Sequence, residues 1–142
     1  KFMEIFFDEF AKVEIKIGTI VAAEKVEGAD RLLKLTVEFG ERGMSGSPTE
    51  PLLPPLNLRG GVVGLSETRI IVSGIAQYYL SEQIIGKQVP VVMNLAPRII
   101  KGIESNGMVL FAIDGSVVDG VAGHTPVMLN PEKNVPPGSV VK

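Results

Sequence analysis

The chain has 142 residues, of which 45% are hydrophobic and 21% are charged. This balance is typical of a globular protein with a real core and argues against disorder. The formal net charge of −2 argues against tight, indiscriminate binding of nucleic acid, because such binding depends on many phosphate contacts. Any nucleic-acid site must therefore concentrate its positive charge locally.

The sequence also limits the available chemistry. It contains no cysteine, which excludes thiol catalysis and fits a reducing, cytoplasmic location. The single histidine, His124, lies in a Gly-rich stretch without nearby ligands, so we expect no metal site and no cofactor. No phosphate-binding loop or nucleophile–base motif is visible, and we expect no enzymatic activity from the chain alone. No apolar run reaches the length of a membrane span, and we expect no membrane partner.

Near the start, Phe2, Phe6 and Phe10 recur at helical spacing. This stripe predicts a short helix over Glu4–Lys12 that plugs one end of the core. An aromatic platform for bases is the alternative, although three aromatics on one stripe usually belong to a core.

The next stretch predicts two strands. Alternation from Val13 to Ile17 indicates the first strand, and the apolar phase shifts after Gly18. A glycine at this place favours a bulge or tight bend, which small barrels need in their first strand. Residues 27–30 form a turn, and alternation over Leu33–Phe39 indicates the second strand.

Residues 41–67 differ from the strands on either side, because they are rich in proline and glycine and their apolar residues show no regular spacing. We expect a long insertion between the second and third strands, packing its leucines locally. The spacing of Pro51 and Pro54 matches a polyproline-II ligand, so a scaffold that docks a partner is an alternative function.

Three further strands are predicted at residues 68–75, 88–95 and 108–113, with a helical turn at residues 81–86. Five short strands with a small helix between the third and fourth is the order of an OB-fold. The expected fold class is therefore all-β with short helices, a five-stranded Greek-key barrel formed by a single domain. Periodicity alone would also allow other small barrels.

The segment Gln88–Met108 offers the best binding site. It leads from a strand through a turn at Pro97 into a loop, and the chain contains no acidic residue from Ile84 to Ile103. The basic residues there are Lys87, Arg98 and Lys101. Such a loop can hold a phosphate and read a base edge without the groups that break bonds.

Five ordered motifs resemble the tRNA-binding OB domain family. They are VEIKIG (13–18), VEGADRLLKL (26–35), IVSGIA (71–76), NLAPR (94–98) and GIESNGM (102–108). The resemblance covers most of residues 8–114, and the Pro-rich segment 131–138 fits as well. This domain occurs at the C-terminus of methionyl-tRNA synthetases, as a separate beta subunit, and as a free-standing structure-specific tRNA-binding protein.

The resemblance implies binding of tRNA by shape and backbone, and a homodimer joined through a C-terminal segment at about 115–142. Ile99 departs from the family pattern, since a second basic residue often follows the Pro-Arg pair. The insertion is also far longer than the usual connection. The tRNA-binding residues implied by position are Asn94, Ser105 and Met108, with Ser73 close by, together with the basic residues Arg98 and Lys101, and Lys87 as a further contact.

Several of these residues also have structural interpretations. Asn94 could cap the Pro97 turn, and Ser105 could anchor its own loop. Of the adjacent Tyr78 and Tyr79, either could stack on a base, but one of such a pair normally points inward.

The expected function is a non-catalytic tRNA-binding module, either the C-terminal domain or the beta subunit of methionyl-tRNA synthetase. Its expected partners are tRNA, a second copy and a catalytic synthetase. The alternative is a secretion-related chaperone that shares this OB dimer and binds unfolded peptides. The apolar residues Ile99, Ile100 and Ile103 favour that alternative.

Overall fold

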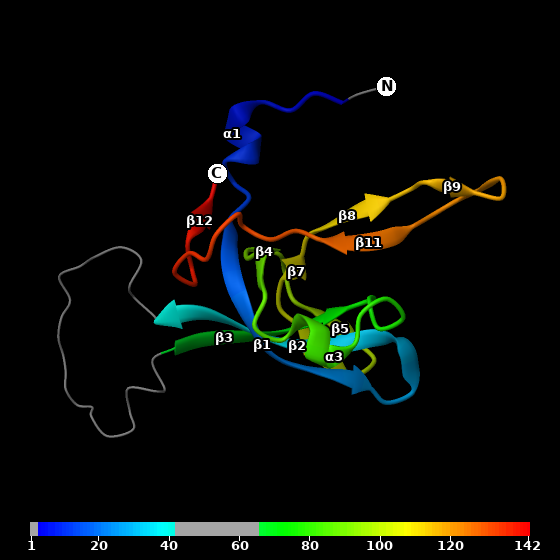
Figure 1. Cartoon of the computed structure of the whole chain (residues 1–142). Coiled ribbons are helices and arrows are strands. Elements are labelled where there is room, and N and C mark those ends of the chain that lie inside the picture. The colour runs from blue at the N-terminus through cyan, green and yellow to red at the C-terminus, as the bar shows by residue number, and fades with distance from the viewer. Residues whose placement is uncertain (1–2, 42–65) are drawn as a thin grey trace, which may run out of the picture.

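A computed structural model describes residues 3–41 and 66–142. Its main element is a curled antiparallel sheet with the strand order β3-β2-β1-β4-β7, and β12 also pairs with β1 (Figure 1). This half-barrel, with the short helix α3 (Ser81–Ile84) between β3 and β4, confirms the predicted fold class. The strands are β1 (Ile15–Val26), β2 (Ala29–Glu41), β3 (Ser66–Ser73), β4 (Gln88–Val92), β7 (Met108–Val109) and β12 (Val140–Val141).

Strand β1 changes partner along its length. Its first part, from Ile15 to Thr19, pairs with β4, and its second part, from Thr19 to Val26, pairs with β2. Gly18 is buried at this point, and a Cβ there would collide with the side chains of Val37 and Phe39. The predicted bend is therefore confirmed, although the register shift itself comes after Ile20.

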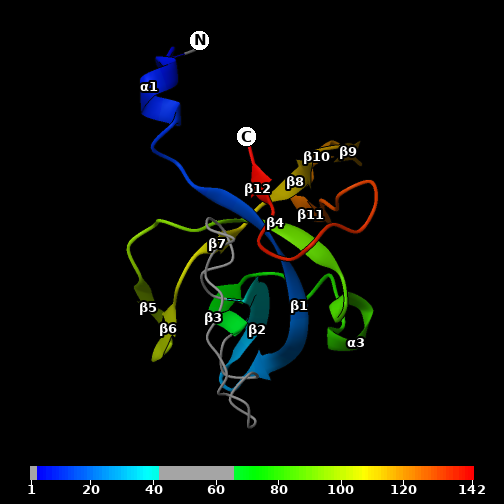
Figure 2. The ribbon, with the colours of Figure 1, turned by 90° about the vertical axis from the view of Figure 1, so that its left-hand side faces the viewer.

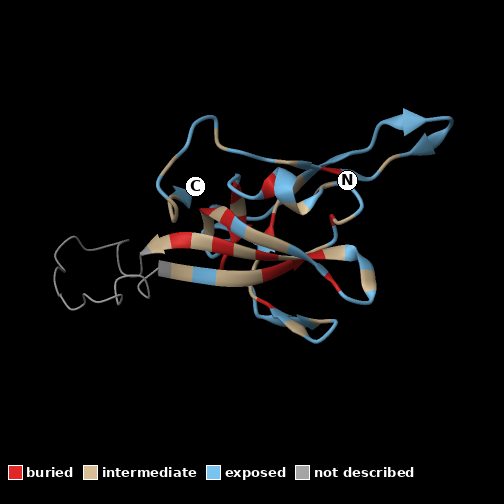
Figure 3. Ribbon diagram, turned by 60° about the horizontal axis from the view of Figure 1, so that its bottom comes forward, coloured by how far each residue is buried: buried red, intermediate tan, exposed pale blue. Residues whose placement is uncertain are grey.

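The core lies inside the curl of the sheet. Apolar residues from β1 to β4 alternate inward, and Ile84 of α3 is buried with them. Figure 3 shows the buried residues gathered in this sheet, whereas the hairpins that stand out from it are exposed. The most deeply buried side chains are Ile20, Leu33, Leu35, Ile71, Ile84, Val37, Val89 and Val91.

The C-terminal residues 130–141, called the strap below, are bound to their own barrel. The buried side chain of Gln88 accepts from the amide of Val135 (3.0 Å) and donates to its carbonyl oxygen (2.8 Å). The amide of Gly138 donates to Ile17 (2.7 Å), and the amide of Ile17 donates to Ser139 (2.8 Å). This part of the predicted dimerisation segment therefore completes the barrel within one chain.

Residues 111–128 form an arm that stands away from the barrel (Figure 1). Strand β8 (Phe111–Asp114) pairs with β11 (Thr125–Met128), and β9 (Val117–Val118) pairs with β10 (Val121–Ala122). The single strand predicted over residues 108–113 is thus wrong. It divides at Leu110, whose amide donates to Pro90, because β7 joins the barrel and β8 joins the arm.

The short N-terminal helix is confirmed, but the packing predicted for it is wrong. Helix α1 spans only Phe7–Phe10 and extends away from the sheet (Figures 1 and 2). Of the predicted stripe, Phe6 and Phe10 are 80% and 42% exposed, so they do not plug the core, and Phe2 lies outside the described residues. The aromatic stripe finds no apolar surface to cover within the described part of the chain.

The predicted insertion lies almost wholly outside the described residues, which stop at Glu41 and resume at Ser66. These two residues pair with each other at the ends of β2 and β3. Among the described residues, no helix is long and apolar enough to cross a membrane.

Gly138 tests how strongly the strap holds the barrel. Its φ is +94°, and a Cβ would collide with the carbonyl oxygen of Phe39. We expect Gly138→Ala to lower the free energy of unfolding by about 3 kcal/mol or more. The matched control is Gly120→Ala, where φ is +77° but nothing lies within 4 Å. This variant should lose only about 1 kcal/mol. Urea denaturation measures both values. Equal losses of unfolding free energy in Gly138→Ala and Gly120→Ala would contradict close packing of the strap against the barrel.

Candidate nucleic-acid interface

The predicted binding loop contains a small hairpin that stands off the barrel (Figure 2). Strand β5 (Arg98–Ile100) pairs with β6 (Ile103–Ser105). Lys101 and Gly102 form the turn with φ of 50° and 80°, and two left-handed residues match the tight turns that suit a twisted hairpin. The turn places Lys101 at the tip.

The hairpin carries a local excess of positive charge. Arg98 and Lys101 are exposed, and neither forms an ion pair with another described residue. Glu104 is the single acid of the hairpin and lies opposite Ile99, which is 69% exposed. Unpaired cations on a protruding element are well placed to reach phosphate oxygens.

Asn94 fastens the start of this loop to the segment before β1. Its side-chain nitrogen donates to the carbonyl of Lys12 (2.6 Å), and its side-chain oxygen accepts from the amide of Glu14 (2.8 Å). Both polar atoms are therefore engaged within the chain. A direct contact between Asn94 and a base stays a prediction. In the structure, the Asn94 side chain binds only backbone groups of Lys12 and Glu14.

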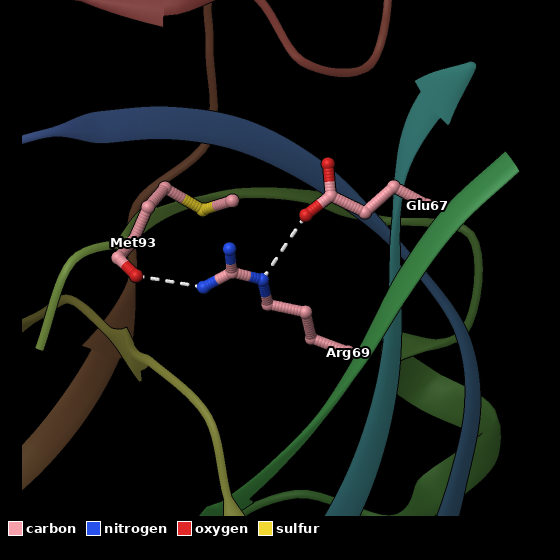
Figure 4. Close-up of polar contacts among 3 residues, drawn as sticks. All are labelled: Glu67, Arg69 and Met93. Carbon is pink, nitrogen blue, oxygen red and sulfur yellow. Dashed lines mark hydrogen bonds and ion pairs between the residues drawn. The ribbon is translucent and has the colours of Figure 1, made fainter. Parts of the chain in front are cut away.

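Arg69 is a residue of this region that sequence reasoning missed (Figure 4). Its guanidinium donates to the carbonyl oxygen of Met93 (2.7 Å) and to the carboxylate of Glu67 (3.2 Å). Arg69 thereby ties β3 to the end of β4, where the loop begins. The available signal was a single arginine in the third strand, two residues after Glu67 and directly before the apolar run at residues 70–72.

Ser105 and its neighbours fasten the far end of the loop. The Ser105 hydroxyl accepts from the amide of Val72 (3.0 Å), and Ser105 is only 6% exposed. The amide of Asn106 donates to Ile70 (2.8 Å). Gly107 follows with φ of +128°, and a Cβ there would press on the backbone of Val92. The Ser105 side chain therefore binds the backbone of β3 and not the backbone of its own loop. Its contact with RNA stays a prediction.

The remaining predicted residues do not form one cluster. Met108 is 46% exposed on β7, next to the hairpin in sequence. Ser73 ends β3 and is half-buried. Lys87 precedes β4, so it lies at the opposite end of that strand from Asn94, about 20 Å away at the usual rise per residue. An interface that includes Lys87 must run along the barrel.

A polar groove of about 410 Å³ separates the hairpin from β3. Lys34 and Arg69 line it, together with Glu104 and Asn106, but both cations are already ion-paired, with Glu24 (3.7 Å) and with Glu67 (3.2 Å). The described residues contain no group of three or more acidic or histidine side chains arranged to hold a metal ion.

Comparison with known proteins agrees with this geometry. A model of a putative tRNA-binding domain matches residues 62–140. The methionine–tRNA ligase of Methanococcoides burtonii is 39% identical over 137 residues, which are 96% of this chain and 16% of the ligase. A MetRS-related protein from Pyrococcus horikoshii is 33% identical with a TM-score of 0.64, and the match covers 99% of this chain and 100% of that one.

The chain therefore belongs to the tRNA-binding domain family, and the resemblance seen in its motifs is confirmed. It is a tRNA-binding domain homologous to part of methionine–tRNA ligases, and it spans about 16% of the length of the curated relatives it matches. The chaperone CsaA of Bacillus anthracis is 22% identical, with a TM-score of 0.69 over 99% of this chain and 100% of that one. This second likeness shows the fold alone.

The free energy of unfolding can distinguish residues that fasten the loop from residues that only extend into solvent. Asn94→Ala removes two hydrogen bonds to the N-terminal segment, and we expect it to lower the free energy of unfolding by about 1–2 kcal/mol. Arg98→Ala removes an exposed, unpaired side chain and should change it by less than about 0.5 kcal/mol. Thermal or urea denaturation measures both values. Equal stability of the two variants would contradict a fastening role for Asn94.

Proposed function

We propose that the chain is the non-catalytic tRNA-binding module of a methionine–tRNA ligase, working in the cytoplasm as its C-terminal domain or as a separate beta subunit. The observation that carries this proposal is the 39% identity to a methionine–tRNA ligase over 96% of the chain. The module holds tRNA near a catalytic partner and contributes no reacting group of its own.

Contact with tRNA is made through the phosphate backbone at the β5–β6 hairpin. Arg98 and Lys101 each neutralise a phosphate, and Met108 packs against the ribose and base surface beside them. The A-form RNA helix has a deep, narrow major groove that side chains cannot read, so recognition follows its shape. Because the base of the hairpin is fastened to β3 and β4, the backbone that carries its cations is positioned before tRNA arrives.

The salt dependence of tRNA binding tests the hairpin. Arg98→Ala/Lys101→Ala removes two phosphate contacts, so the slope of log affinity against log salt should become shallower by about 1.4–1.8. Fluorescence titration of tRNA over a range of salt concentrations measures this slope. Ile99→Lys should act in the opposite direction, because it restores a basic residue on the same hairpin.

The matched control is Lys133→Ala, which removes one exposed positive charge from the strap. It should leave the slope nearly unchanged. If Lys133→Ala made the slope shallower by as much per charge removed as Arg98→Ala/Lys101→Ala does, tRNA would respond to net charge alone, and the proposed contact would be wrong.

We also propose that the module is a homodimer. The exposed apolar side chains near the tip of the arm and on α1 support this assembly. Val117, Val118 and Val121 are each about two-thirds exposed, and Phe6 and Phe7 are more exposed still. The arm and α1 both stand off the barrel, where a second copy can cover them (Figure 1).

Val121→Asp tests the assembly. A buried carboxylate without a partner is costly, so we expect the variant to sediment as a folded monomer while the wild type sediments as a dimer. It should also bind tRNA more weakly, because two joined modules bind with a higher effective concentration. A monomeric wild type at micromolar concentration would contradict the proposal.

The alternative of a peptide-binding chaperone is supported by one feature, the exposed Ile99 on the hairpin. Apolar binding of an unfolded peptide would respond little to salt, whereas binding to phosphates weakens steeply with it. The same titration with an unfolded peptide in place of tRNA therefore separates the two functions.

A further inference from the structure

A second hollow lies between the base of the arm and the end of β3, outside the hairpin. Its volume is about 410 Å³, within the range of small-ligand sites. Its polar groups come from three separate parts of the chain. They are Arg31 near the start of β2, Ser73 at the end of β3 with Gln77 and Tyr78 just after it, and His124 beside the arm strand β11.

The two adjacent tyrosines divide their roles at this hollow. The Tyr79 hydroxyl accepts from the amide of Met128 (3.0 Å) and donates to the carbonyl of Pro126 (3.3 Å), which fixes the base of the arm. Tyr78 is 47% exposed, and its hydroxyl makes no hydrogen bond within the described part of the chain. The expectation that one tyrosine points inward is confirmed, and the other leaves an aromatic face for a ligand.

The charges around the hollow favour an anion. The Arg31 guanidinium is exposed and forms no ion pair with a described residue. Asp30 precedes it in the same strand, so the two side chains point to opposite faces of the sheet. Asp114 in the arm does not line the hollow, and its carboxylate accepts from the hydroxyl (2.6 Å) and the amide (2.9 Å) of Ser116.

We propose that this hollow binds one unstacked, phosphorylated nucleoside. The base stacks on Tyr78, the phosphate pairs with Arg31, and Gln77 and His124 offer hydrogen bonds to a base edge or ribose. This inference rests on the proposed function in one respect: a nucleotide at a single-stranded position of the bound tRNA is one source of the ligand. A free mononucleotide offers the same chemistry.

The first test measures tRNA affinity for three variants, at one salt concentration for the two Tyr78 variants and over a range of salt concentrations for Arg31→Ala. Tyr78→Ala should weaken binding about 5- to 150-fold, the usual range for a lost stacking contact, while Tyr78→Phe keeps the ring and should match the wild type. Arg31→Ala should make the salt slope shallower by about 0.7–0.9. Far-ultraviolet circular dichroism and the melting temperature confirm that each variant is folded.

The second test identifies the source of the nucleotide. AMP and UMP are titrated into the wild-type protein, and the amide NMR shifts of Gln77, Tyr78 and His124 are followed. Shifts that saturate and vanish in Tyr78→Ala, with tRNA affinity unchanged in that variant, would support the site with a free nucleotide as its ligand. Unchanged tRNA affinity in Tyr78→Ala and Arg31→Ala, together with no nucleotide-induced shifts, would overturn the proposal.

The outcomes separate this inference from the proposed function. If the wild-type protein fails to bind tRNA at low salt, the proposed function fails, and the mononucleotide titration alone decides the hollow. If tRNA binds and only the hairpin variants weaken it, with no mononucleotide shifts, the proposed function stands and the second site is wrong.

Discussion

The fold depends on one strand that is hydrogen-bonded to three others. Strand β1 pairs with β4 and β12 at its beginning and with β2 along the rest of its length. Gly18 makes this possible, because the side chains of Val37 and Phe39 occupy the space that a Cβ would need. Close approach at this point lets the sheet curl into a half-barrel. The curl in turn brings residues 105–107 against both β3 and β4, and so it sets the position of the binding loop.

Within that loop, the polar residues serve two different purposes. Asn94, Arg69 and Ser105 direct their polar atoms to backbone groups of the protein itself. Arg98 and Lys101 have no such partners among the described residues and extend into solvent from a hairpin held at its base. A rigid base carrying unpaired cations loses little conformational entropy when it binds a polyanion. The net charge of −2 is compatible with this site because the hairpin itself carries two cations, Arg98 and Lys101, against one acid, Glu104.

The sequence was sufficient to predict β1 and β2, because their long alternating runs bury one face and a glycine marks the bend, but it did not separate β7 from β8 at Leu110. It was insufficient for the β5–β6 hairpin, whose strands of three residues are too short to show a period. The α1 stripe misled because helical spacing cannot say which surface an apolar face will cover. The fastening roles of Ser105 and Arg69 were not predictable either, since each depends on a strand that only the tertiary fold brings alongside.

Hydrogen–deuterium exchange with and without tRNA tests most directly whether the hairpin is the RNA contact. The account predicts that tRNA slows exchange of the hairpin amides at residues 98–104, and that raising the salt concentration reverses this protection. Protection that avoids the hairpin and falls only on the arm and α1, or that persists at high salt, would contradict a backbone-binding site carried by Arg98 and Lys101.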